Sequence, residues 1–354
     1  MFRRLFLPLL LSTLLTATHA LTNFDDWDHG RVALEKVSIH FRYAGQGPPL
    51  LLVHGNPQHS LTWRIIGPIL AEKFTVIAPD NRGAGSSSIP PDGNYTAAAS
   101  AEDLKLLLDH LNITSTYVFS HDKGVGPAVA LAAAYPGLVK RLGVSEYLLP
   151  EFGYEGAAAP GPWLDLYGNW QLAFFSVPDA AEYFIRGRER EMLMWFFYHG
   201  SYSGPEAFPS EIIDRYAASI SKPGFLRAVF GNYENKIVAE DAKFFRGHLG
   251  ATPLDIPTLA MGGEASMAQP FLTMIWQNVT LPIRLEMDVV PKAGHWIADE
   301  NPKWVAERVK RFLDADDEGQ KPAVVDLGWL KDRVTLTVGF YGTLQNAALA
   351  GLSV

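Results

Sequence analysis

The residues most able to do chemistry lie in a short segment around Asp122. A β-rich run from Thr116 to Phe119 gives way within three residues to a small-residue helix from Gly124 to Tyr135. Ser120 and Gly124 flank Asp122 at two residues' distance, and both are small, because larger side chains would clash at a tight strand-to-helix turn. This pattern indicates a nucleophile elbow with a carboxylate in the place of serine. We therefore expect Asp122 to attack carbon and form an ester with its substrate.

Other interpretations of these residues are weaker. Asp122 could cap a helix that starts at Lys123, but a cap needs no small residues around it. The segment from Gly200 to Gly204 has the spaced glycines of a serine elbow, but Tyr202 stands at its centre. Ser120 precedes the turn by two residues, so we do not expect it to face a substrate.

A histidine and a second carboxylate are needed to complete such a site. His295 follows a predicted strand and turn, and an imidazole suits the activation of water because its pKa lies near the working pH. A carboxylate must fix the tautomer of this histidine and stabilise its charged form. Glu146, just past the strand after the elbow, is the favoured candidate, and Glu264 is the alternative. Asp288 lies within a predicted strand, where we expect a structural role.

The composition excludes several classes of protein. Hydrophobic residues make up 48% of the chain and charged residues 19%, as in a protein with a sizeable core. The formal charge is −8 and no basic stripe occurs, so nucleic acid is not an expected partner. Cysteine is absent, which excludes disulfides and thiolate metal sites. The chemistry expected of Asp122 needs no metal or cofactor.

The first 20 residues have the pattern of a secretory signal peptide. Arg3 and Arg4 form a charged start, Leu5 to Leu15 are apolar, and cleavage is expected after Ala20. The apolar stretch of ~11 residues is shorter than the ~20 that span a bilayer. Cleavage removes both arginines and makes the mature charge −10. We expect a secreted protein that has no membrane segment after cleavage.

Three N-glycosylation sequons begin at Asn94, Asn112 and Asn278. A single sequon arises easily by chance, whereas three behind a signal peptide favour a glycoprotein.

Strands and helices alternate along most of the chain. This alternation predicts a mainly parallel sheet wound by right-handed crossovers, hence an α/β fold. The aromatic-rich block at 153–255 is predicted to be a helical cap inserted into this core. The predicted division is a signal peptide at 1–20, a core at 21–152 and 256–315, the cap, and a C-terminal extension at 316–354. The extension contains a plausible strand from Val334 to Val338 and has no assigned role. The strands expected in the core are 37–41, 50–53, 74–78, 116–119, 142–145, 256–261 and 285–290, and the last core helix is 304–313.

Four ordered motifs resemble those of the α/β-hydrolase superfamily: His54 to Pro57, Asp80 to Ser86, Ser120 to Gly124, and Gly294 to Trp296. The carboxylate at the elbow places the resemblance in the branch with an aspartate nucleophile, which contains epoxide hydrolases and haloalkane or fluoroacetate dehalogenases. The resemblance covers residues 24–315 and is closest to epoxide hydrolases. It implies an α/β-hydrolase fold with an inserted helical cap.

The resemblance also implies an oxyanion site and a group that protonates the leaving oxygen. The backbone N–H groups of Asn56 and Lys123 would bind the oxyanion, while His54 shapes the loop. Tyr233 stands in a segment that resembles the one carrying a cap tyrosine acid. A second donor would lie at Trp170 and Gln171, where Gln171 takes the place of a histidine. A glutamine can donate a hydrogen bond there but cannot supply its proton.

Some residues point toward dehalogenases instead. Haloalkane dehalogenases carry an asparagine at the position of Asn56 but a tryptophan where this chain has Lys123. Fluoroacetate dehalogenases carry an arginine there to hold a carboxylate, and Lys123 could do the same as a point charge or could be an exposed lysine. The sequence thus favours an epoxide hydrolase for a small, mainly apolar substrate bound under an aromatic cap. A dehalogenase is the alternative, and a non-catalytic binding protein with this fold is a more distant one.

Overall fold

A mainly parallel sheet forms the centre of the computed structural model, which describes residues 23–158, 166–266, 268–315, 321–331 and 337–338. Within these residues the strand order is β8-β7-β6-β5-β3-β4-β2-β1-β9. The strands from β3 to β8 run parallel, β2 is antiparallel to β1 and β4, and β9 is parallel to β1. Their bounds are β1 (Asp28–Ala33), β2 (Ser38–Ala44), β3 (Pro49–Val53), β4 (Thr75–Pro79), β5 (Thr116–His121), β6 (Val139–Ser145), β7 (Thr258–Gly263), β8 (Leu285–Val290) and β9 (Thr337–Val338).

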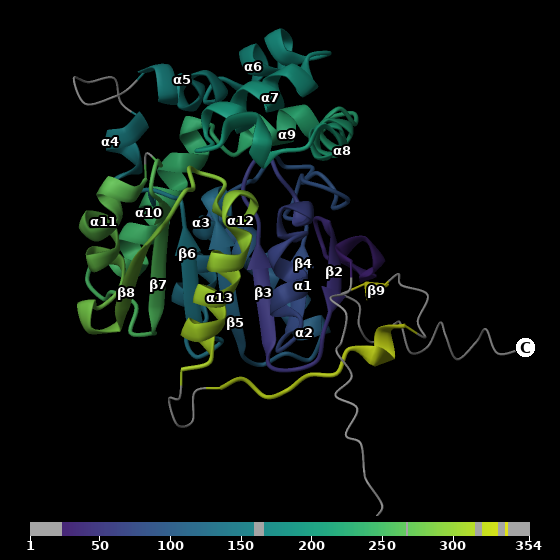
Figure 1. The fold of residues 1–354 in the computed structure, drawn as a ribbon, viewed down its shortest axis with the longest axis vertical. Helices are drawn as coiled ribbons and strands as arrows, with labels where there is room; N and C mark the ends of the chain where they lie inside the picture. Colours follow the sequence, from purple (N-terminus) through teal and green to yellow (C-terminus); the bar gives the residue numbers. More distant parts are fainter. Residues whose placement is uncertain (1–22, 159–165, 267, 316–320, 332–336, 339–354) are drawn as a thin grey trace, which may run out of the picture.

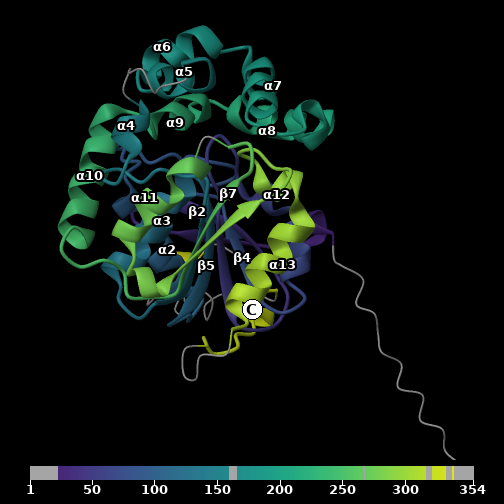
Figure 2. The same cartoon turned by 60° about the vertical axis from the view of Figure 1, so that its left-hand side comes forward.

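Apolar strands are buried here because helices cover both faces of the sheet. Along β3, Leu51 and Val53 join one hydrophobic core, while Leu50 and Leu52 join the other. Successive side chains of a strand point to opposite faces, so a wholly apolar run can serve two cores. Figure 2 shows the two helix layers on either side of the strands. One layer contains α2 (Ala97–His110), α3 (Val125–Ala134) and α11 (Leu272–Val279), and the other contains α1 (Ile66–Leu70), α12 (Ile297–Glu300) and α13 (Pro302–Leu313).

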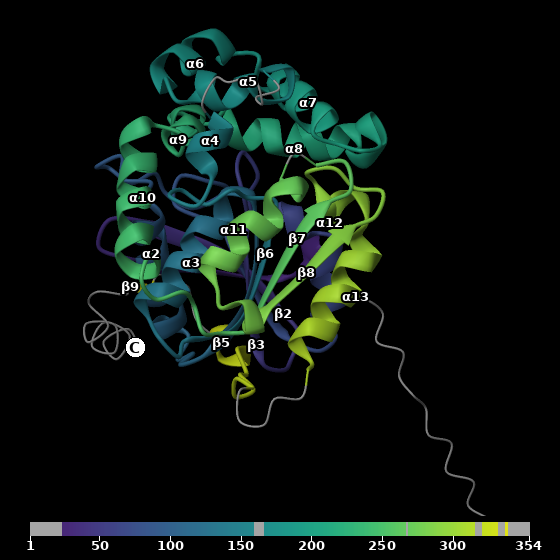
Figure 3. The ribbon, with the colours of Figure 1, turned by 90° about the vertical axis from the view of Figure 1, so that its left-hand side faces the viewer.

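The segment between β6 and β7 is helical and lies over the carboxyl ends of the strands (Figures 1 and 3). Its last helix, α10, returns along the core and packs against α2 and α3, with Phe245 and Leu249 buried. The other helices lie above the sheet. The helices are α4 (Tyr154–Ala158), α5 (Leu166–Phe175), α6 (Pro178–Ile185), α7 (Glu189–His199), α8 (Ser210–Ile220), α9 (Phe225–Gly231) and α10 (Asn235–Leu249).

These features confirm the predicted α/β-hydrolase fold. β1 was not predicted, because its sequence is mostly polar; it pairs with β2, and Val32 is fully buried. The signal peptide predicted at 1–20 lies outside the described residues, as do residues 334–336 of the strand predicted in the extension. Residues 321–331 of the extension pack on the core, where Leu327 and Leu330 are buried. None of the described helices has the length and apolar character needed to span a membrane.

Candidate active site

Asp122 stands at a tight turn that only small neighbours permit. β5 ends at His121, Asp122 has a φ of 49°, and α3 begins at Val125. Such a positive φ is uncommon for residues other than glycine and concentrates at functional sites. A Cβ atom on Gly124 would lie 2.4 Å from the carbonyl oxygen of His54, so a side chain there would clash.

Ser120, two residues before the turn, is buried away from any substrate. Its hydroxyl donates a hydrogen bond to the carbonyl oxygen of Gly143 at 3.0 Å.

The two carboxylate oxygens of Asp122 have different partners. Oδ1 accepts a hydrogen bond from the backbone N–H of Asn56 at 2.8 Å. Oδ2 lies 3.5 Å from Nε2 of His295. On the other side of the ring, Nδ1 of His295 donates to Oε2 of Glu146 at 3.0 Å. The structure thus brings Asp122, His295 and Glu146 into one line, although they are far apart in the sequence.

Glu146 and Glu264, the two candidates for the second carboxylate, differ sharply in their surroundings. The Glu146 side chain is fully buried, has a backbone φ of 59°, and accepts a hydrogen bond from the N–H of Gly263 at 2.6 Å. The hydroxyl of Ser266 also donates to the carboxylate of Glu146. Glu264 is exposed and accepts from the N–H of Lys292 at 2.9 Å. The contact to His295 is therefore made by Glu146.

We expect Glu146→Gln to lower kcat by about 100-fold or more, because a neutral amide cannot stabilise the charged imidazole. Glu264→Gln is the matched control, with an expected change below about 3-fold. Steady-state kinetics on both purified variants would test this expectation. A larger loss in the Glu264 variant would contradict the assignment.

The charges of Asp122, His295 and Glu146 shift the pKa values of Asp122 and His295 in opposite directions. Burial alone would raise the pKa of Asp122, but the hydrogen bond and charge of His295 outweigh it and lower that pKa to about 2. Burial alone would lower the pKa of His295, but the contacts with Asp122 and Glu146 raise it to about 10. At neutral pH the resting site therefore holds an aspartate and an imidazolium.

This shift makes the stability of the protein depend on pH. The pKa of His295 rises from an ordinary 6.5 to about 10, so the folded state gains stability from its charge fully below pH 6.5. That gain disappears as the pH rises through about 10. We therefore expect the difference in Tm between the native protein and His295→Gln to shrink between these two pH values, as measured by thermal unfolding. A constant difference would mean that His295 titrates normally.

His54 shapes the loop beside the elbow. Its Nε2 accepts a hydrogen bond from the N–H of Asn81 at 2.8 Å, so its Nδ1 carries the proton and donates to the carbonyl oxygen of Gly55 at 2.7 Å. Both ring nitrogens are therefore occupied and cannot bind a substrate. A Cβ atom on Gly55 would lie 2.4 Å from Cβ of Asp122, so only glycine lets this loop approach the carboxylate.

Tyr233 and Lys123 lie together, while Trp170 packs elsewhere. Tyr233 is buried, and its ring centroid lies 4.4 Å from the ammonium nitrogen of Lys123. Trp170 is 38% exposed and contacts other cap aromatics, among them Trp195 at 5.1 Å between ring centroids. Gln171 is half-buried on the same helix, α5. A small cavity lies beside the elbow, and neither Trp170 nor Gln171 lines it; Asp122, His295 and Tyr233 are not among its lining residues either.

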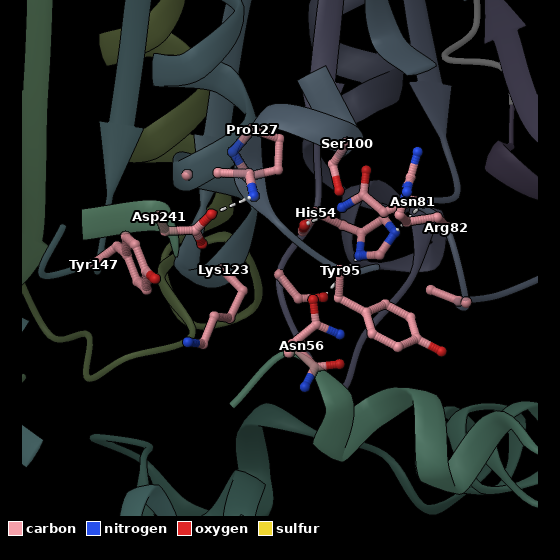
Figure 4. A pocket seen from close by; sticks show the side chains of 16 residues that line it. His54, Asn56, Asn81, Arg82, Tyr95, Ser100, Lys123, Pro127, Tyr147 and Asp241 are labelled. Carbon is pink, nitrogen blue, oxygen red and sulfur yellow. Dashed lines mark hydrogen bonds between the residues drawn. The ribbon is translucent and has the colours of Figure 1, made fainter. Parts of the chain in front are cut away.

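That cavity has a volume of about 40 Å³, enough for a few water molecules. Figure 4 shows Lys123, Tyr147 and Asp241 among the side chains around it, together with His54 and Asn56. Sequence reasoning did not find Tyr147 and Asp241. Burial raises the pKa of Asp241 to about 7, and its carboxylate accepts from the N–H of Ala97 at 2.7 Å. The described residues hold no cluster of His, Asp or Glu side chains suited to a metal ion.

Comparison with known proteins identifies the family. A family model for the alpha/beta hydrolase fold matches residues 48–302. The soluble epoxide hydrolase of Corynebacterium sp. (strain C12) is 30% identical over 286 residues, which are 80% of this chain and 96% of that protein. The fluoroacetate dehalogenase of Burkholderia sp. is 26% identical over 303 residues, covering 82% of this chain and 95% of that protein. The solved structure of epoxide hydrolase CorEH without ligand has a TM-score of 0.71 at 29% identity and covers 81% and 98% of the two chains.

The chain belongs to the α/β hydrolase fold family. Within that family it is an epoxide-hydrolase-like enzyme, as the sequence predicted.

Proposed function

We propose that this enzyme opens an epoxide to a diol through a covalent ester on Asp122. This proposal rests on the different partners of the two carboxylate oxygens of Asp122. Oδ1 accepts a hydrogen bond from the N–H of Asn56, and Oδ2 faces His295. A carboxylate held in this way is oriented for attack on carbon and stays ionised at neutral pH. The similarity to two proteins named epoxide hydrolases supports the choice of substrate.

In the first half-reaction Oδ2 of Asp122 attacks a ring carbon, and the carbon–oxygen bond of the epoxide breaks. The leaving oxygen takes a proton from Tyr233, the buried tyrosine whose ring lies beside Lys123. The product of this step is a hydroxyalkyl ester of Asp122.

Ester formation changes the electrostatics of His295. The hydrogen bond and negative charge of Asp122 raise the pKa of His295, and both are lost when the carboxylate becomes a neutral ester. The pKa of His295 therefore falls, and the ring gives up its proton, which restores the Tyr233 hydroxyl. The neutral imidazole can then act as a base toward water.

In the second half-reaction His295 takes a proton from water, which attacks the ester carbon of Asp122. Charge develops on Oδ1, where the N–H of Asn56 already donates a hydrogen bond. Glu146 stabilises the imidazolium that forms. Collapse of the tetrahedral intermediate breaks the bond between the attacked carbon and the ester oxygen, and the leaving oxygen takes the remaining proton of the attacking water. The diol is released and Asp122 is again a carboxylate.

A single turnover in ¹⁸O-labelled water tests this function and mechanism together. With enzyme in excess over styrene oxide, we expect an unlabelled diol and label in the carboxylate of Asp122, detected by mass spectrometry of its peptide. Label in the diol of the first turnover would show that water attacks the epoxide directly. Absence of diol would contradict the proposed activity itself.

Dehalogenation is the second candidate. Lys123 places a positive charge next to the nucleophile, and a protein named fluoroacetate dehalogenase is 26% identical to this chain. A haloacid carboxylate bound by Lys123 would leave its carbon in reach of Asp122. Measuring chloride and fluoride release from chloroacetate and fluoroacetate beside diol formation from styrene oxide separates the two activities.

We also propose that the chain is exported and glycosylated. The signal pattern at 1–20 supports export, and exposed side chains at Asn112 and Asn278 support modification of these two sequons. Asn94 is half-buried and accepts a hydrogen bond from the N–H of Thr96 at 3.1 Å. We expect the secreted protein to begin at Leu21 and to lose mass with peptide N-glycosidase F. A protein that starts at Met1 with unchanged mass would contradict both proposals.

A further inference from the structure

The ammonium group of Lys123 sits among three tyrosine rings. Its nitrogen lies 4.4 Å from the ring centroids of Tyr154 and Tyr233 and 5.5 Å from that of Tyr147. It also donates a hydrogen bond to the hydroxyl of Tyr154 at 3.2 Å. Each of the three tyrosines is less than 9% exposed. A cation held in this way is fixed in direction and partly shielded from water, which strengthens its field.

The proposed ring opening creates a need for such a charge. When Tyr233 gives its proton to the leaving oxygen, a phenolate remains in a buried position. Burial and the nearby charge of Asp122 raise the pKa of Tyr233 well above its ordinary range, and a side-chain hydrogen bond with Asn56 offsets this only in part. The buried phenolate is therefore unfavourable, and a nearby positive charge would stabilise it. Gln171 has no proton to donate in place of a second acid.

We propose that Lys123 is the counter-charge of the Tyr233 phenolate, and that Tyr154 holds it in place. This inference rests on the proposed function. Lys123 acts through Tyr233 and does not itself touch the reacting atoms, so it is a positioning residue of the first half-reaction.

The proton balance of the step is complete within the site. The carbon–oxygen bond of the epoxide and the O–H bond of Tyr233 break, while the bond from Oδ2 of Asp122 to carbon and the O–H bond of the product form. The Lys123 ammonium lies 4.4 Å from the centroid of the ring that carries the phenolate. The phenolate persists until the His295 imidazolium, whose pKa drops on ester formation, returns a proton to it. His295 regains that proton from the water that hydrolyses the ester.

The two carboxylates near Lys123 have hydrogen-bond partners other than Lys123. Asp241 lines the same cavity, and its carboxylate accepts a hydrogen bond from the N–H of Ala97. Burial raises the pKa of Asp241, and the charge of Lys123 lowers it only in part. Asp122 is engaged by His295 and the N–H of Asn56. Among the described residues, the only hydrogen bond found for the Lys123 ammonium is to Tyr154, a neutral group.

The test separates the two half-reactions with styrene oxide, which carries no carboxylate for Lys123 to bind. Single turnovers are followed by quenched-flow mass spectrometry. Lys123→Met is expected to form the Asp122 ester about 10- to 100-fold more slowly than the native enzyme. This loss is part of the ~10²–10⁴-fold rate gain that general acid catalysis contributes. Hydrolysis of the ester and substrate affinity should stay within about 3-fold. Lys123→Arg keeps the charge and should recover most of the rate of ester formation.

Lys105→Met is the matched control. The Lys105 ammonium also lies over a tyrosine ring, 5.5 Å from the ring centroid of Tyr135, but it belongs to α2 and contacts none of the three tyrosines around Lys123 in the described contacts. This variant should form ester at the native rate. Tyr154→Phe removes the hydroxyl that holds Lys123 and should slow ester formation alone. If Lys123→Met fails to fold, as circular dichroism would show, Tyr154→Phe decides the outcome.

Three results would overturn the inference. The first is ester formation at the native rate in Lys123→Met or, if that variant does not fold, in Tyr154→Phe. The second is an equal loss of rate in both half-reactions. The third is a loss of substrate affinity with both rates unchanged. A native enzyme that forms no Asp122 ester would instead refute the proposed function, so the two failures remain distinct.

Discussion

Asp122→Ala is expected to abolish diol formation, lowering kcat/KM by about 10⁴-fold or more. The reason is that the carboxylate is the group that bonds to carbon, and loss of a nucleophile leaves only substrate binding and the oxyanion donor. Substrate affinity should change little, because alanine removes no part of the cap. Diol formation measured by gas chromatography and substrate binding measured by calorimetry would check both expectations.

Ser120→Ala is the control for this variant. The Ser120 hydroxyl contacts the carbonyl oxygen of Gly143 inside the sheet, so its loss should leave kcat/KM within about 3-fold. Substantial activity in Asp122→Ala would mean that water or another side chain attacks the epoxide. A large loss in Ser120→Ala would mean that the elbow depends on this buried contact.

His295→Gln is expected to trap the ester. Asp122 remains ionised and held by the N–H of Asn56, so the first half-reaction still proceeds, although more slowly once the proton of the imidazolium is absent. Without a base near the ester, hydrolysis should fall by about 10³-fold or more. Intact-protein mass spectrometry should show one added substrate molecule per chain, located on the Asp122 peptide.

The same experiment on Asp122→Ala is the control, since no adduct can form there. An unmodified His295→Gln enzyme that turns over at the native rate would show that His295 is not the base. A stable adduct on any other residue would contradict the role of Asp122.

The sequence predicted those parts of the site that depend on local geometry. The small residues Ser120 and Gly124 indicated the turn at Asp122, because a tight corner excludes bulky neighbours wherever it occurs. The strand-to-helix alternation indicated an α/β fold, because strands joined through helices form a mainly parallel sheet. The order of the four motifs then carried the resemblance to α/β hydrolases, and that resemblance implied that His54 shapes the loop beside the elbow.

Only the tertiary structure decided which side chains meet at the site. Glu146 and Glu264 follow neighbouring strands, and the chain alone does not show which one faces His295. The positive φ of Glu146 and its hydrogen bonds to Gly263 and Ser266 settle its direction, whereas Glu264 points to solvent.

The surroundings of Lys123 are likewise a property of the folded cap. Tyr147 and Tyr154 both follow β6, whereas Tyr233 follows α9, and no local pattern marks the three as partners. Sequence periodicity reports how each segment folds and which of its faces is buried. The contacts between distant segments depend on how the cap packs against the core, and that packing determines the electrostatic environment of Asp122.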